Sequence, residues 1–163
     1  MNRLAKILKA VMTVVRILVA LLLTGTVVST TLQIITRYVL GNSLSWTEQV
    51  TRYLFIWLVA LGIPLSFYEG GSFKFDILIK KLGPKVGFVT DIIVWLAILG
   101  FSSYYFYWSL MLVIKAGGKL SAGIAIPYYY LYGAQPVAAF LLIWVTLADI
   151  VKYLQKRKAD RLS

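Results

Sequence analysis

The sequence contains no cysteine and no histidine among its 163 residues. The chain therefore cannot form a disulfide bond, a thiolate or imidazole zinc site, an iron–sulfur cluster or a histidine-ligated haem, and it has no thiol nucleophile. Acidic residues are also scarce, with 6 Asp and Glu against 17 Lys and Arg. Most redox and hydrolytic chemistries lack their usual side chains, and we predict that the protein is not an enzyme.

Charged residues make up only 14% of the chain, whereas 60% are hydrophobic and 15% aromatic. The mean hydropathy of +0.81 is higher than a soluble domain of this size would carry, which predicts an integral membrane protein. The net charge is +11, and the cations lie between the apolar runs. We interpret them as topology signals and contacts to anionic membrane lipids, and expect no binding of nucleic acid.

Four long apolar segments are predicted to cross the membrane as helices in an all-α fold. Between Arg16 and Arg37 lie 20 uncharged residues, about 30 Å of helix, which matches the hydrocarbon core of a bilayer. This run is too long for a signal peptide and has no cleavage site, so we expect it to be retained. The predicted spans cover residues 16–37, 46–68, 84–114 and 127–151 of a single membrane domain, residues 1–163.

Two alternatives stay open for the start of the fourth span. Either one helix begins near Pro127 and is kinked at Pro136, or the chain is broken between these two prolines before the helix proper begins.

The distribution of Lys and Arg predicts the orientation of the chain. One side of the predicted spans collects thirteen of these residues, and the other has only Arg37, Arg52, Lys115 and Lys119. The positive-inside rule places both termini in the cytoplasm. The opposite ends of the spans carry an aromatic belt that includes Tyr38, Trp46, Tyr53, Tyr104, Tyr105, Tyr107, Trp108, Tyr128, Tyr129, Tyr130 and Tyr132.

The loop between the second and third spans contains an amphipathic segment at residues 73–82. A helix over this segment has one apolar face, formed by Phe75, Leu78, Ile79 and Leu82, with Lys74, Lys80 and Lys81 off that face. These features predict a helix that lies in the interface of the cytoplasmic leaflet.

None of the six acids falls at the centre of a predicted span, which argues against a self-contained proton-coupled antiporter. Asp91 and Asp149 lie near the same membrane side as Arg16. Arg16 is therefore a candidate partner for one of these acids across the bundle. The alternative is local pairing, for example of Asp149 with Lys152.

Two further patterns concern polar residues within the spans. Glu48 and Arg52 have the i, i+4 spacing of an ion pair on a helix surface, and either form a local pair or join Arg37 in a polar patch that contacts a partner. Gly25, Ser29 and Gln33 share one face of the first span, where we favour helix packing over a substrate path. We interpret Gly117, Gly118 and Gly123 as loop flexibility.

Residues 35–76, ITRYVLGNSLSWTEQVTRYLFIWLVALGIPLSFYEGGSFKFD, resemble the small membrane subunit of tripartite ATP-independent periplasmic (TRAP) transporters, the DctQ-like family. The ordered elements that carry the resemblance are Arg37-Tyr38, Trp46, Glu48, Arg52-Tyr53, Trp57, Gly62 and Asp76. Pro127 and Pro136, nine residues apart, also resemble the family. One departure is Gln49, where the family often has a second acid after Glu48.

The resemblance implies a scaffold that sits beside a large, elevator-type membrane subunit in the bacterial inner membrane. That large subunit would carry the substrate and sodium sites, so no cofactor is expected in this chain. A periplasmic binding protein would deliver the substrate, an organic acid such as a dicarboxylate, sugar acid or sialic acid. The positions marked by the family pattern for partner contact or structure are Arg37, Tyr38, Trp46, Glu48, Arg52, Tyr53 and Trp57.

The competing hypothesis is a stand-alone small transporter or channel that works as a homo-oligomer. Such a protein needs a polar path through the membrane, and the face of Gly25, Ser29 and Gln33 is the available candidate.

Overall fold

The computed structural model describes residues 3–39, 41, 45–70, 84–121 and 125–160, and within these ranges the regular structure is helical. The helices are α1 (Arg3–Tyr38), α2 (Ser45–Gly70), α4 (Pro84–Ala116), α5 (Tyr129–Tyr132) and α6 (Ala134–Asp160). Four of them are long and apolar enough to cross a membrane, which confirms the prediction of four apolar helices. The predicted interfacial helix at residues 73–82 lies outside the described residues.

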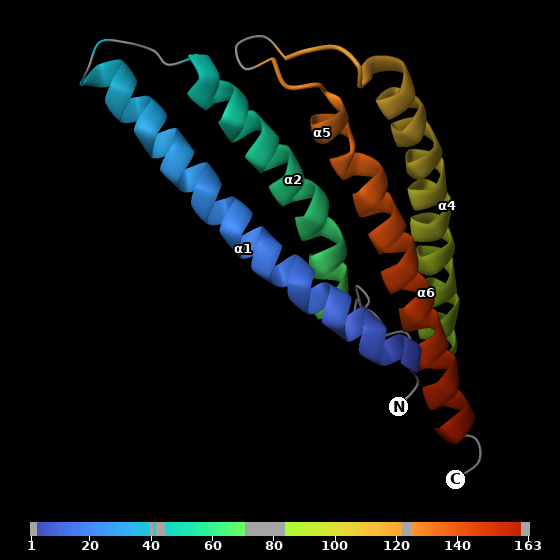
Figure 1. The fold of residues 1–163 in the computed structure, drawn as a ribbon. Coiled ribbons are helices and arrows are strands. Elements are labelled where there is room, and N and C mark those ends of the chain that lie inside the picture. The colour runs from blue at the N-terminus through green and yellow to red at the C-terminus, as the bar shows by residue number, and fades with distance from the viewer. Residues whose placement is uncertain (1–2, 40, 42–44, 71–83, 122–124, 161–163) are drawn as a thin grey trace.

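The long helices form an open row in the order α1, α2, α6, α4 (Figure 1). Along most of their length α1 packs only on α2 and α4 only on α6, so the four helices do not close into a bundle. The two chain ends lie at one end of the row and the connection from α1 to α2 at the other (Figure 1). We call these the inner end and the outer end, after the orientation that the sequence predicts.

One continuous face of α1 packs against its neighbours. Its buried and half-buried positions alternate by four and three residues: Leu8, Met12, Val15, Val19, Leu22, Thr26, Ser29, Gln33 and Thr36. This is the heptad spacing of helices that pack side by side with a slight left-handed twist. The seam is apolar at the inner end and polar at the outer end, so different interactions hold the two ends of α1.

The face predicted to pack, with Gly25, Ser29 and Gln33, lies on or beside this seam. A Cβ at Gly25 would lie 3.3 Å from Leu54 Cδ1 of α2, which shows how closely the two helices approach. Ser29 Oγ lies 2.8 Å from Thr51 Oγ1 of α2. The structure therefore favours helix packing over a substrate path at this face.

The main hydrophobic core lies at the inner end, where α1 crosses from α2 to α6 (Figure 1). Its buried members come from three helices: Leu8, Met12, Val15, Leu61, Leu65, Leu141 and Val145. The sequence places the start of the first span at Arg16, whereas α1 begins at Arg3 and the residues before Arg16 supply part of this core. Lys6 and Lys9 interrupt the apolar run but remain exposed, since they lie off the buried seam.

The fourth span is interrupted at a single residue, Gly133, near its start. The short helix α5 ends at Tyr132, Gly133 follows, and α6 begins at Ala134. Gly133 itself has helical dihedral angles, φ −60° and ψ −22°, and its N–H donates to the carbonyl of Tyr129 at 2.9 Å. Pro136 is the third residue of α6. The structure thus has one apolar helical segment over Tyr129–Gln155, with a local irregularity just before Pro136, whose missing N–H removes one helical hydrogen bond.

The inner core predicts a large cost for shortening a buried side chain of the α1 N-terminal segment. Leu8→Ala should lower the free energy of unfolding by about 3 kcal/mol, because it leaves a cavity among α1, α2 and α6. Ile7→Ala removes a similar side chain that is 49% exposed and should change it far less. Thermal unfolding of both variants in one detergent measures the difference, and equal destabilisation would contradict the placement of Leu8 in the core.

Candidate partner-binding surface at the outer end of α2

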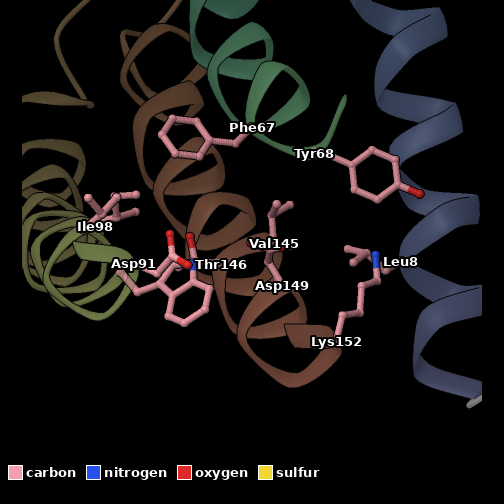
Figure 2. Close-up of a pocket in the computed structure, with 11 residues that line it drawn as sticks. Leu8, Phe67, Tyr68, Asp91, Ile98, Val145, Thr146, Asp149 and Lys152 are labelled. Atoms are coloured by element: carbon pink, nitrogen blue, oxygen red, sulfur yellow. The ribbon is translucent and has the colours of Figure 1, made fainter. Parts of the chain in front are cut away.

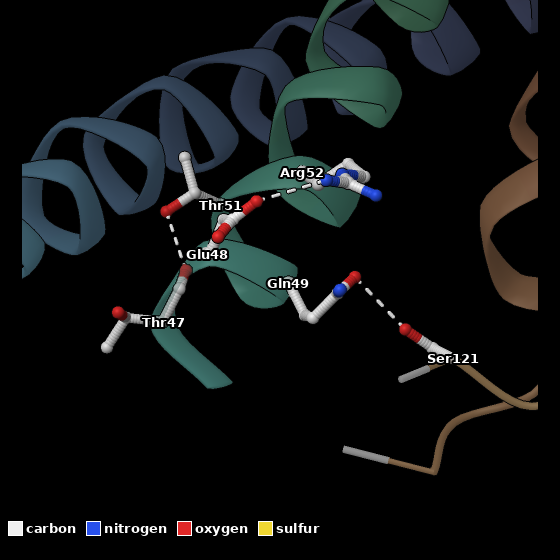
Figure 3. Close-up of polar contacts among 6 residues, drawn as sticks. All are labelled: Thr47, Glu48, Gln49, Thr51, Arg52 and Ser121. Atoms are coloured by element: carbon white, nitrogen blue, oxygen red, sulfur yellow. Dashed lines mark hydrogen bonds and ion pairs between the residues drawn. The ribbon is translucent and has the colours of Figure 1, made fainter. Parts of the chain in front are cut away.

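The outer half of α2 presents three faces to three different surroundings, because residues four apart share one side of a helix. Thr47 and Thr51 face α1, Gln49, Tyr53 and Trp57 face the connection between α4 and α6, and Glu48 and Arg52 are exposed. Figure 3 shows Thr51, Glu48 and Gln49, one from each face, leaving α2 in different directions.

On the first face, hydroxyl groups join α2 to α1. The Thr51 hydroxyl donates to the backbone carbonyl of Thr47 at 2.9 Å, and the Ser29 hydroxyl lies 2.8 Å from Thr51 Oγ1. Thr47 is fully buried. Two helices of a membrane protein gain little from hydrophobic contact with each other in lipid, so such small polar contacts fix their register.

On the second face, three side chains bind the chain between α4 and α6. Trp57 Nε1 donates to the carbonyl of Tyr130 at 2.7 Å, and the Tyr53 hydroxyl donates to the carbonyl of Ile126 at 3.3 Å. Gln49 Oε1 accepts a hydrogen bond from the Ser121 hydroxyl at 3.0 Å (Figure 3). We call Gln49, Tyr53 and Trp57 the α2 clamp, since they hold this connection to α2.

The α2 clamp was only partly visible in the sequence. Tyr53 and Trp57 belong to the positions marked by the family resemblance, and Gln49 was noted only as a departure from it. Tyr53 and Trp57 donate to the backbone carbonyls of Ile126 and Tyr130, and a contact to a backbone carbonyl leaves no signal in a sequence. The i, i+4, i+8 spacing of three long polar side chains on one face was the available clue.

A close contact between Gly117 and Tyr129 secures the same connection. The N–H of Tyr129 donates to the carbonyl of Gly117 at 2.9 Å. A Cβ at Gly117 would overlap the ring of Tyr129 and the carbonyl oxygen of Val113, whereas one at Gly118 would make an ordinary contact with Tyr129. The interpretation of Gly117 as loop flexibility is therefore wrong, since this position needs a residue without a side chain.

The exposed face carries the ion pair that the spacing predicts. Arg52 Nη2 lies 3.2 Å from Glu48 Oε1, and the two side chains are 48% and 61% exposed. An exposed pair of this kind stabilises a fold by at most about 1 kcal/mol, so both charges are available to a partner at little cost. Arg37, Tyr38 and Trp46 are exposed as well, and no ion pair joins Arg37 to Glu48 in the described part of the chain.

At the inner end, the ion pair that the structure gives to Arg16 is with Glu69. Arg16 Nη2 lies 2.6 Å from Glu69 Oε1, so the acid differs from the predicted partners Asp91 and Asp149. The reason is the order of the helices. Because α1 packs along α2, the end of α2 comes to lie beside Arg16, while Asp91 belongs to α4 at the far side of the row.

Asp91 of α4 and Asp149 of α6 instead line a small cavity at the inner end, to which α1 and α2 also contribute Leu8, Phe67 and Tyr68 (Figure 2). Lys152 lies at the same cavity, with its Nζ 5.6 Å from the ring centre of Tyr68. The volume of about 40 Å³ has room for roughly three water molecules, far less than a site for an organic substrate. The described residues contain no group of three metal-binding side chains.

Comparison with known proteins gives a family match over most of the chain. The model for the DctQ component of the tripartite ATP-independent periplasmic transporters matches residues 26–156. This range contains the α2 clamp and the exposed pair of Glu48 and Arg52. The matched range begins at residue 26 and therefore does not include Leu8, Met12 and Val15 of the inner core.

Individual relatives carry names of the same kind. A putative TRAP transporter small permease protein of Haemophilus influenzae is 39% identical over 64 residues, which are 37% of this chain and 40% of that protein. The C4-dicarboxylate TRAP transporter small permease protein DctQ of Pseudomonas aeruginosa is 26% identical over 125 residues, 73% of this chain and 59% of the relative. The isethionate TRAP transporter permease protein DctMQ of Oleidesulfovibrio alaskensis is 28% identical over 107 residues, 64% of this chain and 17% of the relative. Each match spans less than two thirds of the relative's own length.

The α2 clamp predicts that the indole N–H of Trp57 contributes measurably to stability. Trp57→Phe keeps an aromatic ring but leaves the carbonyl of Tyr130 without this donor, which should cost about 1 kcal/mol of unfolding free energy. Trp108→Phe, at an exposed position of α4, is the matched control and should have little effect. Unfolding of the purified variants in detergent tests this, and a stable Trp57→Phe protein would mean that the hydrogen bond is dispensable.

We expect Gly117 and Gly118 to differ in whether they tolerate substitution by alanine. Gly117→Ala should destabilise the protein by about 2 kcal/mol, since the new Cβ displaces the Tyr129 ring. Gly118→Ala should be close to neutral because its Cβ meets Tyr129 at an ordinary 3.4 Å. The midpoints of thermal unfolding compare the two, and equal midpoints would show that Gly117 has no special steric role.

Proposed function

The chain belongs to the DctQ component family of the TRAP transporters, and from this premise we propose that it is the scaffold subunit of a sodium-coupled importer of organic acids. Family membership and its four apolar helices make it a multi-pass membrane subunit of a transporter. In the proposal, a large membrane subunit carries the substrate and sodium sites. A periplasmic binding protein delivers the substrate, and this chain supports the large subunit while the latter moves.

The observation that carries the scaffold role is the way α2 is tied to both of its neighbours. Ser29 and Thr51 fix α1 to α2 at the outer end, and the α2 clamp fixes the connection between α4 and α6 to the same helix. At the inner end a shared core joins α1, α2 and α6. A row of helices held at both ends moves as one body, which suits a subunit that must stay rigid beside a moving partner.

The same contacts weigh against the stand-alone transporter. Its candidate path was the polar face of α1, but Ser29 on that face is bonded to α2 and Gly25 lies against Leu54. The cavity at the inner end is too small for an organic acid. No second observation in the described part of the chain favours a substrate path.

The relatives support the proposed partner and substrate class. The names of two of them refer to C4-dicarboxylate and to isethionate, both small organic anions. In the permease protein DctMQ the matched region is only 17% of the chain. A segment like this one can therefore be part of a much larger membrane permease, which fits a large partner subunit.

The two ends of the row have different proposed contacts. The exposed residues Glu48 and Arg52, together with Arg37, form a charged surface at the outer end that contributes to docking of the binding protein. Both termini lie in the cytoplasm, where the exposed Lys6 and Lys9 contact anionic lipids. The segment at residues 73–82 lies in the membrane interface and fixes the depth of the scaffold.

Substrate uptake by vesicles that contain the large subunit, this chain and added binding protein tests both parts of the proposal. Uptake should be lost when this chain is omitted. Glu48→Arg should reduce uptake at limiting binding protein by roughly three- to tenfold, as a misplaced charge at a docking surface costs about 1 kcal/mol.

The exchanged variant Glu48→Arg with Arg52→Glu separates docking from local helix stability. It restores an ion pair of the same spacing but inverts the charges that face a partner. We expect it to remain as impaired as the single variant. Recovery of wild-type uptake in the exchanged variant would show that the pair acts only within α2, and undiminished uptake without the chain would disprove the scaffold role.

A further inference from the structure

The cavity at the inner end carries charges of both signs at different places on its wall. Asp91 of α4 and Asp149 of α6 line it together with Lys152. In Figure 2, Lys152 extends toward α1 and Tyr68, whereas Asp91 projects from α4 at the opposite side of the view. The wall therefore has a positive group at one side and a negative group at the other.

The Asp91 carboxylate has no partner within the part of the chain that the structure describes. It is half-buried, and neither an ion pair nor a hydrogen bond joins it to another side chain there. Its neighbours on the cavity wall include the apolar side chains of Val94, Trp95 and Ile98. A carboxylate in such surroundings is costly unless a cation pairs with it. A ligand with a cationic group would supply this pairing.

The size of the cavity limits the size of that cationic group. Its volume of about 40 Å³ has room for roughly three water-sized groups. An aminoethyl group is of this size, and its ammonium has N–H groups that can donate to a carboxylate. A trimethylammonium group is bulkier and has no N–H. The cavity therefore favours a primary ammonium.

The cavity lies where two apolar spans end, which is the depth of lipid headgroups. Asp91 is close to the start of the span Val89–Ala116, and Asp149 and Lys152 are close to the end of the span Tyr129–Gln155. Exposed apolar side chains adjoin the lining residues in sequence, with Ile93 60% and Leu147 47% exposed. These side chains provide surface for the acyl chains of a lipid.

We propose that this cavity binds the headgroup of phosphatidylethanolamine. The ammonium enters the cavity and donates to the carboxylates of Asp91 and Asp149, while the phosphate stays at the cavity mouth and accepts from the Lys152 ammonium. Phosphatidylglycerol has no cation to pair with the carboxylates, and phosphatidylcholine has the bulkier group. The site is formed by this chain alone, so it does not depend on the proposed function.

Native mass spectrometry of the full chain in a neutral detergent tests the site. Phosphatidylethanolamine, phosphatidylcholine and phosphatidylglycerol with identical acyl chains are added separately, and the fraction of chain that retains one lipid is compared. Phosphatidylethanolamine should be retained at a concentration roughly tenfold lower than the other two, as expected when a charge-assisted hydrogen bond is lost.

Two variants remove the two sides of the site, and each has a matched control. Asp91→Asn and Lys152→Gln should each weaken phosphatidylethanolamine binding roughly tenfold. Glu69→Gln and Lys115→Gln remove exposed charges that do not line the cavity, and should leave binding unchanged. Thermal unfolding without lipid shows whether each variant is folded. If Asp91→Asn is not, Lys152→Gln still decides the question, because Lys152 is exposed.

Three results would overturn the proposal. The first is equal retention of the three lipids or a preference for phosphatidylglycerol, and the second is unchanged phosphatidylethanolamine binding in the folded variants. The third concerns glycerophosphoethanolamine, which is the same headgroup without acyl chains. We expect it to bind far more weakly, and binding as tight as that of the lipid would assign the cavity to a soluble zwitterion instead.

Discussion

Backbone carbonyls that lose contact with solvent have to be paired within the protein, and the hydrogen bonds from α2 to the connection between α4 and α6 do this at the outer end of the molecule. The carbonyls of Ile126 and Tyr130 in this connection accept hydrogen bonds from Tyr53 and Trp57 of α2. The short helix α5 and the hydrogen bond from Tyr129 to the carbonyl of Gly117 add further backbone pairing among the described residues. These bonds add to the direct packing of α6 against α2 and α4.

The two ends of the molecule are held by different forces because they meet different surroundings. At the outer end, hydroxyl, amide and indole groups of α2 make directional contacts that set the register of its neighbours. At the inner end, Leu8, Met12 and Val15 of α1 pack into a core with α2 and α6. The packed face of α1 runs from the inner end to the outer end, so the same helix takes part in the apolar core and in the polar contacts with α2.

An open row of helices leaves much more apolar surface exposed than a closed bundle would. For a self-contained transporter this arrangement has no interior in which a substrate could travel. Within the row, α2 packs on both α1 and α6, and α4 packs on α6. The exposed charges of Glu48 and Arg52 lie at the opposite end of the row from the exposed Lys6 and Lys9.

The sequence by itself determined the class of protein, the number of apolar helices and the family, because hydropathy over some 20 residues and an ordered set of side chains are local properties. It also determined the ion pair of Glu48 and Arg52 and the packing face around Ser29, which depend only on spacing along one helix. Tertiary structure alone decided that Arg16 meets Glu69, that Gly117 receives a tyrosine ring and that Leu8 and Met12 are core residues. Each of these contacts depends on which helices become neighbours. The order of the helices is set by hydrogen bonds to backbone carbonyls and by side chains that are far apart in the sequence. Such contacts produce no local sequence pattern.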